Sequence, residues 1–486
     1  MQHRPTTVQA SRHSEASDGG GARRQGRGLR RWLVGWGLAL LCGLGLGSPA
    51  HSGERGAWLR AQLSAADGKL PAAVRDEKYA VMSTSALAFF RGSAHLFWQD
   101  LGKSPQLAPF GGVASTRIWL VGDAHPNNFA SLRNARGALV YDLNDFDESV
   151  IADYQLDLWR MATALVLLMR ENGGFAAQDE ARIVEAFSER YLNTLEACVG
   201  TELEKTATLT ADNAYGKLDD FLRSVANKKS QKRLLETYTQ KDESGARVLS
   251  PQASPDLAAV TTETVAALRA AMPAYGASLR GGLTYSAGRF TVKSVAQRLH
   301  AGLGSLGSSR YYVQIEGETT SPDDDVILDI KLQGPPSAYR SLAAEAIAAT
   351  EAASGGDPAR RVVTAARALG NYVDDYLGVM KLSGASYSVR ERSAWKDYLD
   401  VEKLRSVERM SKLAEQWAAI LAFAHARADR DAADSGIRYD FEKEVTERTR
   451  GKRAEFHARL RSIALAQAAQ VTDDYRAFLR DRPPVH

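Results

Sequence analysis

The apolar positions of the chain follow two different periods. Apolar residues recur every three or four positions, as in amphipathic helices, over 51–115, 176–240, 341–353, 360–377 and 401–479. Residues 283–332 instead alternate and are rich in Thr, Tyr, Val and Ile, which is typical of strands, and Tyr387–Arg390 continues that character. The pattern predicts an α+β fold, mostly helical, with a small antiparallel sheet in the second half of the chain.

Shorter elements are predicted in the first half. Arg117–Val121 is expected to be a buried strand, and 129–132 and 138–141 are expected to form a hairpin around the turn Asn134–Gly137. The helix predicted over 153–170 is apolar on most faces, so it belongs inside the core.

The first 50 residues resemble an export signal in composition. An arginine-rich segment ends at Arg31, the apolar run 32–47 follows, and Ser48-Pro49-Ala50 offers small residues for cleavage. We expect export to the periplasm, or anchoring in the inner membrane if 32–47 is retained. Membrane contact is expected only through this segment.

The net charge of +4 comes from the same segment. Removing its seven arginines and two acidic residues leaves 55 basic and 56 acidic residues. The remainder is close to neutral, so nothing in its charge predicts a nucleic-acid partner.

Two polar segments carry the candidate chemistry. Asp123 follows the buried strand, Asn128 lies five residues later, and Asp142 ends the hairpin that begins after Asn128. In a phosphoryl-transfer site one carboxylate orients or deprotonates the nucleophile, while an amide and a second carboxylate hold Mg²⁺ on phosphate oxygens. We therefore expect Asp123 and Asn128 to be catalytic, and Asn128 and Asp142 to bind metal. Asp157, at the start of the apolar helix, is expected to accept N–H bonds from the Asp123 loop.

The sequence leaves alternatives for the roles of other polar residues in and next to these segments. His125 is either a metal ligand or base, or a packing and hydrogen-bonding residue of the loop. Asp145, Asp147 and Glu148 crowd next to Asp142; adjacent carboxylates repel unless a cation lies among them, so Asp145 is a further candidate metal ligand, with a solvated surface as the alternative.

A glycine-rich segment lies far downstream, between two predicted strands. Its backbone N–H groups are suited to phosphates, and the residues expected to contribute are Gly302, Gly304, Ser305 and Gly307. Lys331, on the next strand, is expected to reach the phosphates and to pair with Glu345, or with Glu351, of the following helix. The alternative is an ordinary hairpin whose lysine extends toward solvent.

The order of these segments is the reverse of that in protein kinases. If both form one site, the chain is a circularly permuted, two-lobed kinase-like fold. Its expected parts are the signal and N-terminal region at 1–50, a large-lobe part at 51–280, the small lobe at 281–400, and C-terminal helices on the large lobe at 401–486.

Seven motifs in order resemble a known bacterial family, the domain of unknown function 2252 (DUF2252). They are Phe89–Gly92, Gly122–Phe129, Tyr141–Glu148, Asp157–Ala162, Gly302–Gly307, Tyr387–Arg390 with Lys396, and Ala424–Arg427. The second and third are also similar to the catalytic and metal loops of aminoglycoside-phosphotransferase-type kinases. The resemblance implies a protein-kinase-like fold that uses ATP and Mg²⁺, with Arg91 expected to contact phosphate or substrate. The chain departs from the family at Lys331-Leu-Gln, where Lys-Glu-Ala is usual, and after about 430.

The sequence is compatible with three functions. The first is a kinase-like phosphotransferase that uses a nucleotide and an unidentified acceptor. The second is an exported kinase-fold protein without catalysis, in a binding or assembly role, which the scarcity of ATP outside the cytoplasm favours. The third is a metal-dependent hydrolase built on the carboxylates at 123–148 alone.

Overall fold

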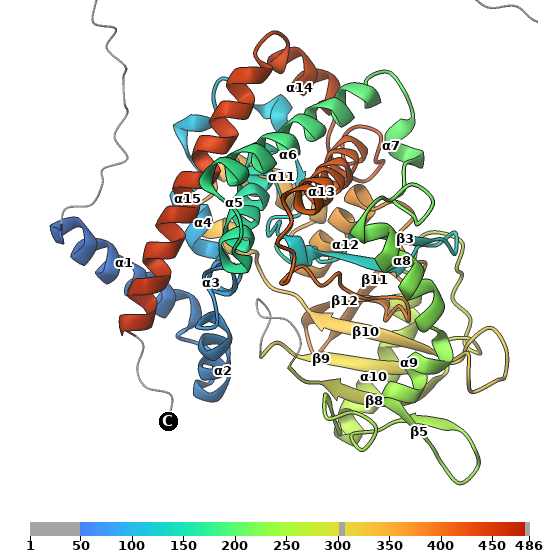
Figure 1. The fold of residues 1–486 in the computed structure, drawn as a ribbon. Helices are drawn as coiled ribbons and strands as arrows, with labels where there is room; N and C mark the ends of the chain where they lie inside the picture. Colours follow the sequence, from blue (N-terminus) through green and yellow to red (C-terminus); the bar gives the residue numbers. More distant parts are fainter. Residues whose placement is uncertain (1–48, 301–306, 482–486) are drawn as a thin grey trace, which may run out of the picture. The chain divides into compact units, whose positions relative to one another are not determined.

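A six-stranded antiparallel sheet forms the β-rich part of the chain in the computed structural model (Figure 1). Its order is β11-β12-β10-β9-β8-β7. The strands are β7 (Leu257–Ala258), β8 (Val292–Arg298), β9 (Arg310–Ile315), β10 (Val326–Leu332), β11 (Gly378–Leu382) and β12 (Ala385–Glu391). The strands predicted within 283–332 and at 387–390 are confirmed. Lys331 lies in β10, opposite Arg310 of β9 and Ser388 of β12.

The two faces of this sheet differ because side chains alternate along each strand. One face presents Leu328 and Ile330 to a core that includes Leu268 and Met272 of α10 (Thr262–Gly276). The opposite face carries Ile327 in a smaller core, while Asp329 and Lys331, two and four residues on, continue that face with charged side chains. This charged part of the sheet borders the candidate site.

The largest core surrounds α5 (Gln155–Asn172), whose residues from Gln155 to Met169 are all buried. A helix that is apolar on nearly every side is stable only when neighbours cover all of those sides. The neighbours here are α3 (Ala86–Gly92), α6 (Ala177–Cys198) and α15 (Arg453–Asp481), while α13 (Val407–Arg427) packs along α6. The expectation of a core helix is confirmed.

Three small antiparallel pairs complete the strands. They are β1 (Arg117–Leu120) with β4 (Val150–Asp153), β2 (Phe129–Arg133) with β3 (Leu139–Leu143), and β5 (Thr239–Lys241) with β6 (Arg247–Leu249). The strands predicted at 117–121, 129–132 and 138–141 are therefore confirmed.

The other elements are short helices. They are α1 (Pro49–Asp67), α2 (Ala72–Met82), α4 (Ala94–Leu101), α7 (Leu203–Thr206), α8 (Lys217–Lys228), α9 (Gln231–Tyr238), α11 (Ala344–Ser354), α12 (Pro358–Leu369) and α14 (Phe441–Thr449), with the 3-10 turns η1 (Pro105–Leu107), η2 (Ala114–Thr116), η3 (Pro126–Asn128) and η4 (Ser337–Arg340). The helix predicted over 360–377 ends at Leu369, because Gly370 follows and the chain turns toward β11. The fold is α+β and about half helical.

The structure describes residues 49–300 and 307–481. The chain divides into two units, 1–50 and 51–486, and the second contains the sheet and the candidate site. The apolar run 32–47 of the predicted export signal lies outside the described residues, as do Gly302, Gly304 and Ser305 of the glycine segment. Among the helices of the described residues, none is both long enough and apolar enough to span a membrane.

Candidate functional site

The loop that carries Asp123 is held by one buried carboxylate. Asp157, in the first turn of α5, accepts hydrogen bonds from the backbone N–H groups of Val121 (2.7 Å) and Gly122 (3.0 Å). Its side chain is 1% exposed, and Nε2 of His425 lies 3.3 Å from it. The expected bracing role of Asp157 is thus confirmed, and it fixes the point at which β1 delivers Asp123.

Gly122 is required by the same turn. Its φ is +82°, and a Cβ atom there would lie 2.0 Å from the carbonyl oxygen of Glu148. The two polar segments therefore approach each other backbone to backbone, which is possible only with glycine at this position.

Asp123 itself is paired with a buried arginine. Its Oδ1 accepts from Nε of Arg160 (2.7 Å) and from Nη2 of the same side chain. Its Oδ2 lies 3.7 Å from Nε2 of His125. Burial, followed by the charges of Arg91 and Arg160, lowers the pKa of His125 well below its usual value, so this histidine is neutral.

The pairing with Arg160 was not anticipated from the sequence. A signal for it exists, because Arg160 is the only charged residue between Leu158 and Met169 of an otherwise apolar helix. A charge in such a helix requires a partner, and Asp123 is the carboxylate that the neighbouring loop supplies.

Asn128 joins the two polar segments. Its Nδ2 donates to the backbone carbonyls of Asp123 (3.1 Å) and Asp145 (3.2 Å), and its Oδ1 accepts the N–H of Asp145 (2.8 Å). The amide expected to be catalytic and metal-binding therefore lies beside both Asp123 and Asp145.

The expected metal binding by Asn128 together with Asp142 stays a prediction, and the amide of Asn128 bonds to Asp145 rather than to Asp142. Asp142 lies within β3 and accepts from the N–H of Leu143 (2.8 Å), with Nη2 of Arg427 at 4.0 Å. Burial raises its pKa, although Arg427 opposes the shift. The strand continues to Leu143, and the chain only then turns back to Asn128, so Asp145 rather than Asp142 arrives there.

Lys331 is paired with a different carboxylate from the one expected. Its Nζ forms an ion pair with Oδ2 of Asp147, and Nε2 of Gln333 donates to Oδ1 of the same residue (2.9 Å). Burial raises the pKa of Asp147, but the Lys331 ammonium outweighs it and holds that pKa below its usual range.

The predicted partners of Lys331 lie elsewhere. Glu345 is exposed at the start of α11, and Glu351 lies near Tyr339, whose pKa is raised by burial and by the charge of Glu351. Both are on α11, which packs against β4 and α12 rather than against the sheet. The next helix instead supplies the buried Arg361, which donates to the carbonyls of Asp147 and Ser149, both at 2.6 Å. This arginine holds the turn that carries Asp147.

Two adjoining cavities connect these groups. The larger is partly open to solvent and is lined by Asp123, Asn128, Asp145 and Ser308, with Arg91 and His125. The other is narrower and is lined by Asp142 and Lys331. Asn144, Asp145 and Asp147 line both cavities. We call the combined space the cleft.

Groups at the Asp123 end of the cleft retain bonding capacity. Nε of Arg91, Nδ1 of His125 and Nη1 of Arg160 are buried and find no hydrogen-bond partner among the described residues. Arg91 lines the cleft close to Asp123, as its expected contact with phosphate or substrate requires. Gly307, the part of the glycine segment that is described, lines a smaller cavity with Lys331.

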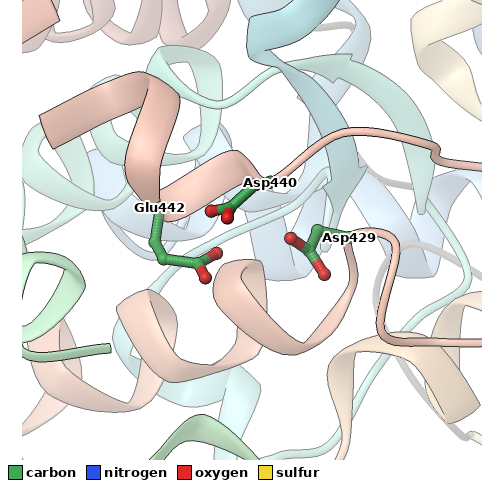
Figure 2. Close-up of side chains that lie close together, drawn as sticks. All are labelled: Asp429, Asp440 and Glu442. Atoms are coloured by element: carbon green, nitrogen blue, oxygen red, sulfur yellow. The ribbon is translucent and has the colours of Figure 1, made fainter. Parts of the chain in front are cut away.

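Asp429, Asp440 and Glu442 form a separate acidic group (Figure 2). Oxygens of Asp429, Asp440 and Glu442 lie within 4.8 Å of one another. Burial, followed by the charges of Asp429 and Asp440, raises the pKa of Glu442 to about 8. Burial likewise raises the pKa of Asp429 to about 6. The group therefore retains a proton near neutral pH.

Gly122→Ala should unfold more easily than Gly137→Ala. Both glycines have positive φ (+82° and +75°), which costs alanine roughly 1–2 kcal/mol, but a Cβ at Gly137 meets nothing within 4 Å. The clash with Glu148 should add about 2 kcal/mol or more at Gly122. Urea unfolding measures the difference, and equal losses would contradict the described approach of the two segments.

Glu442 should make stability fall with rising pH. Its folded-state pKa of about 8 exceeds the usual value of 4.5, so its contribution is complete below about pH 4.5 and is lost as the pH rises through 8. The free energy of unfolding should fall by up to about 1.4 kcal/mol per pH unit in that window.

Urea unfolding from pH 5 to pH 9 tests this expectation. Glu442→Gln should flatten the profile, while Glu447→Gln, an exposed position on the same helix α14, should leave it unchanged. Parallel profiles for all three proteins would show that Glu442 is ionised throughout.

The comparisons with known proteins give one family. The model of the family described as uncharacterized protein conserved in bacteria, DUF2252, matches residues 69–481. No curated protein and no solved structure matches the chain.

Proposed function

Because the chain belongs to the DUF2252 family, whose description names no activity, we propose a function from its own residues: it is a kinase-like phosphotransferase. It moves a phosphoryl group from a nucleotide, with Mg²⁺, to an acceptor. The observation that carries the proposal is the junction at Asn128, which bonds to the loops of Asp123 and Asp145 at one end of a cleft whose other end contains Lys331.

The metal would be held by Asn128 and Asp145. Both offer oxygen atoms, the ligands that Mg²⁺ prefers, and the carboxylate of Asp145 forms no ion pair within the described part of the chain. Mg²⁺ at this position would neutralise charge on the phosphates. The proposal replaces Asp142 by Asp145, because Asp142 is oriented toward Arg427.

Lys331 would bind the phosphates. It lies on the strand that follows the glycine segment and its neighbour β9, the arrangement in which protein kinases carry their phosphate-binding lysine. Its ion pair with Asp147 must open or rearrange for this, because a phosphate would compete with the Asp147 carboxylate for the same ammonium group.

Asp123 would orient the acceptor. A hydroxyl oxygen of the acceptor attacks the terminal phosphorus, the bond from that phosphorus to the nucleoside diphosphate breaks, and the hydroxyl proton passes to Oδ2 of Asp123. Oδ1 is already bound by Arg160, so Asp123 is better suited to orienting the hydroxyl than to removing its proton early. The unpaired Nε–H of Arg91 and the unpaired Nδ1 of His125 are available to hold the acceptor.

The order of the segments makes this a circularly permuted kinase-like arrangement. The catalytic loop at 122–128 precedes the glycine segment at 302–307, yet Ser308 lines the same cavity as Asp123. This proximity favours the phosphotransferase over a hydrolase built on 123–148 alone, which has no need of the glycine segment.

A kinase-like protein without catalysis is the second candidate. Two observations favour it: the candidate base is bound by Arg160, and the candidate phosphate-binding lysine is bound by Asp147 rather than by a helix glutamate. Export, which remains a prediction, would also place the protein where ATP is scarce.

Thermal unfolding with and without Mg²⁺–ATP separates the two candidates. Mg²⁺–ATP at a hundred times its dissociation constant should stabilise the native chain by about 2.7 kcal/mol. Asp145→Asn should lose the part of this stabilisation that depends on Mg²⁺, because the substitution removes a metal ligand.

Asp142→Asn is the matched comparison, since it neutralises a neighbouring carboxylate that faces Arg427. It should keep the ligand-induced shift even if its own melting temperature is lower. An equal shift in Asp145→Asn and the native chain would refute the metal assignment, and no shift in the native chain would favour the non-catalytic candidate.

A further inference from the structure

Three basic side chains gather on one wall of the cleft, in the motif that the proposed chemistry leaves unused. Arg390 is near the end of β12, Arg392 follows the strand on the same face, and Lys396 lies four residues later. All three line the cavity that also contains Lys331. We call these three residues the cationic wall.

The cationic wall lacks carboxylate partners. Arg390 donates to the backbone carbonyl of Asn144 (2.7 Å), and Arg392 donates to that of Ser393 (2.8 Å). The ring centroid of Tyr398 lies 5.7 Å from Nζ of Lys396. Across 49–300 and 307–481, none of the three forms an ion pair, whereas Lys331, Arg310 and Arg160 each have one.

Several carboxylates line the cavity together with the cationic wall, and Asp329 lies opposite Arg390 in the sheet. Asp329 is already bound by Arg310 through Nε (2.6 Å) and Nη2. Burial, then the charges of Arg390, Arg392 and Arg310, lowers the pKa of Lys396 well below its usual value, and Asp329 opposes the shift. A bound anion would act in the same direction as Asp329 and favour the charged form of Lys396.

Two further carboxylates lie near Arg390 and compensate its charge in part. Burial raises the pKa of Asp374 to about 6, so this carboxylate stays mostly ionised near neutral pH. Burial together with the charge of Asp374 raises the pKa of Glu391 to about 7, so Glu391 is only about half ionised there. The wall nevertheless keeps three side-chain donors without an ion-pair partner in the described residues, and an anion from outside can accept hydrogen bonds from them.

We propose that Arg390, Arg392 and Lys396 bind a phosphate group of the molecule that occupies the cleft, at a second position beside the one proposed for Lys331. The second phosphate position rests on the proposed function and adds that the ligand carries several phosphates. A phosphate carries nearly two negative charges and three acceptor oxygens, which suits three donors that converge from one wall.

Phosphate binding without metal tests this proposal on the full chain. The probes are tripolyphosphate, ATP and adenosine, each in EDTA, with melting temperature measured as a function of concentration. Tripolyphosphate and ATP should raise the melting temperature, and adenosine should not. If tripolyphosphate binds as tightly as ATP, the phosphates alone are recognised; if ATP binds more tightly, the phosphates belong to a nucleotide.

The variant is Lys396→Met, which keeps the length of the side chain and relieves repulsion, so it should fold. It should weaken the binding of both phosphate probes about tenfold or more, because the substitution removes a charge-assisted hydrogen bond. Lys403→Met, at an exposed turn seven residues later, and Lys396→Arg should both bind like the native chain.

Two results would overturn the inference: no stabilisation of the native chain by either phosphate probe, or native affinity in Lys396→Met. Its failure is distinct from failure of the proposed function, because Asp145→Asn should leave this metal-free binding intact. Binding that depends on Lys396 without any Mg²⁺-dependent shift would leave the phosphate site standing and refute the phosphotransferase.

Discussion

The carboxylate of Asp157 is the interaction on which the candidate site depends. It is nearly inaccessible to solvent and accepts the two N–H groups that precede Asp123. Hydrogen bonds to a buried charge contribute about 1.5–3 kcal/mol each, so the loop is firmly tied to the first turn of α5. Because α5 is itself enclosed by other helices, the largest core of the protein determines where Asp123 lies.

Ion pairs within the cleft neutralise much of its charge. Arg160 binds Asp123, Lys331 binds Asp147, and Arg310 binds Asp329. Each pair keeps a reactive group in place and also competes with any ligand for it. A ligand that breaks these pairs must therefore carry charges that replace the displaced ones. Mg²⁺ supplies positive charge, and phosphates supply negative charge. Asp145 and the cationic wall are among the cleft groups without such partners in the described residues, and in the proposal they bind the metal and the phosphate.

Much of the fold could be predicted from periodicity, because strands and helices that bury one face carry apolar residues at a regular spacing in the sequence. Alternation predicted β8 to β10, and the almost wholly apolar run predicted α5 as a core helix with Asp157 at its start. Asp145 could not be distinguished from Asp142, since the choice depends on where β3 ends and the chain turns. The partner of Lys331 also depends on tertiary packing: α11 turns toward β4, and Asp147 takes the place expected for Glu345.

The most direct test of the account is diffraction from crystals grown with Mn²⁺ and a non-hydrolysable nucleotide analogue. Anomalous scattering should locate the metal within about 2.5 Å of oxygen atoms of both Asn128 and Asp145, with phosphate oxygens completing its coordination and Lys331 released from Asp147. A cleft without metal in crystals that contain the analogue, or a metal bound at Asp142 and not at Asn128, would contradict it.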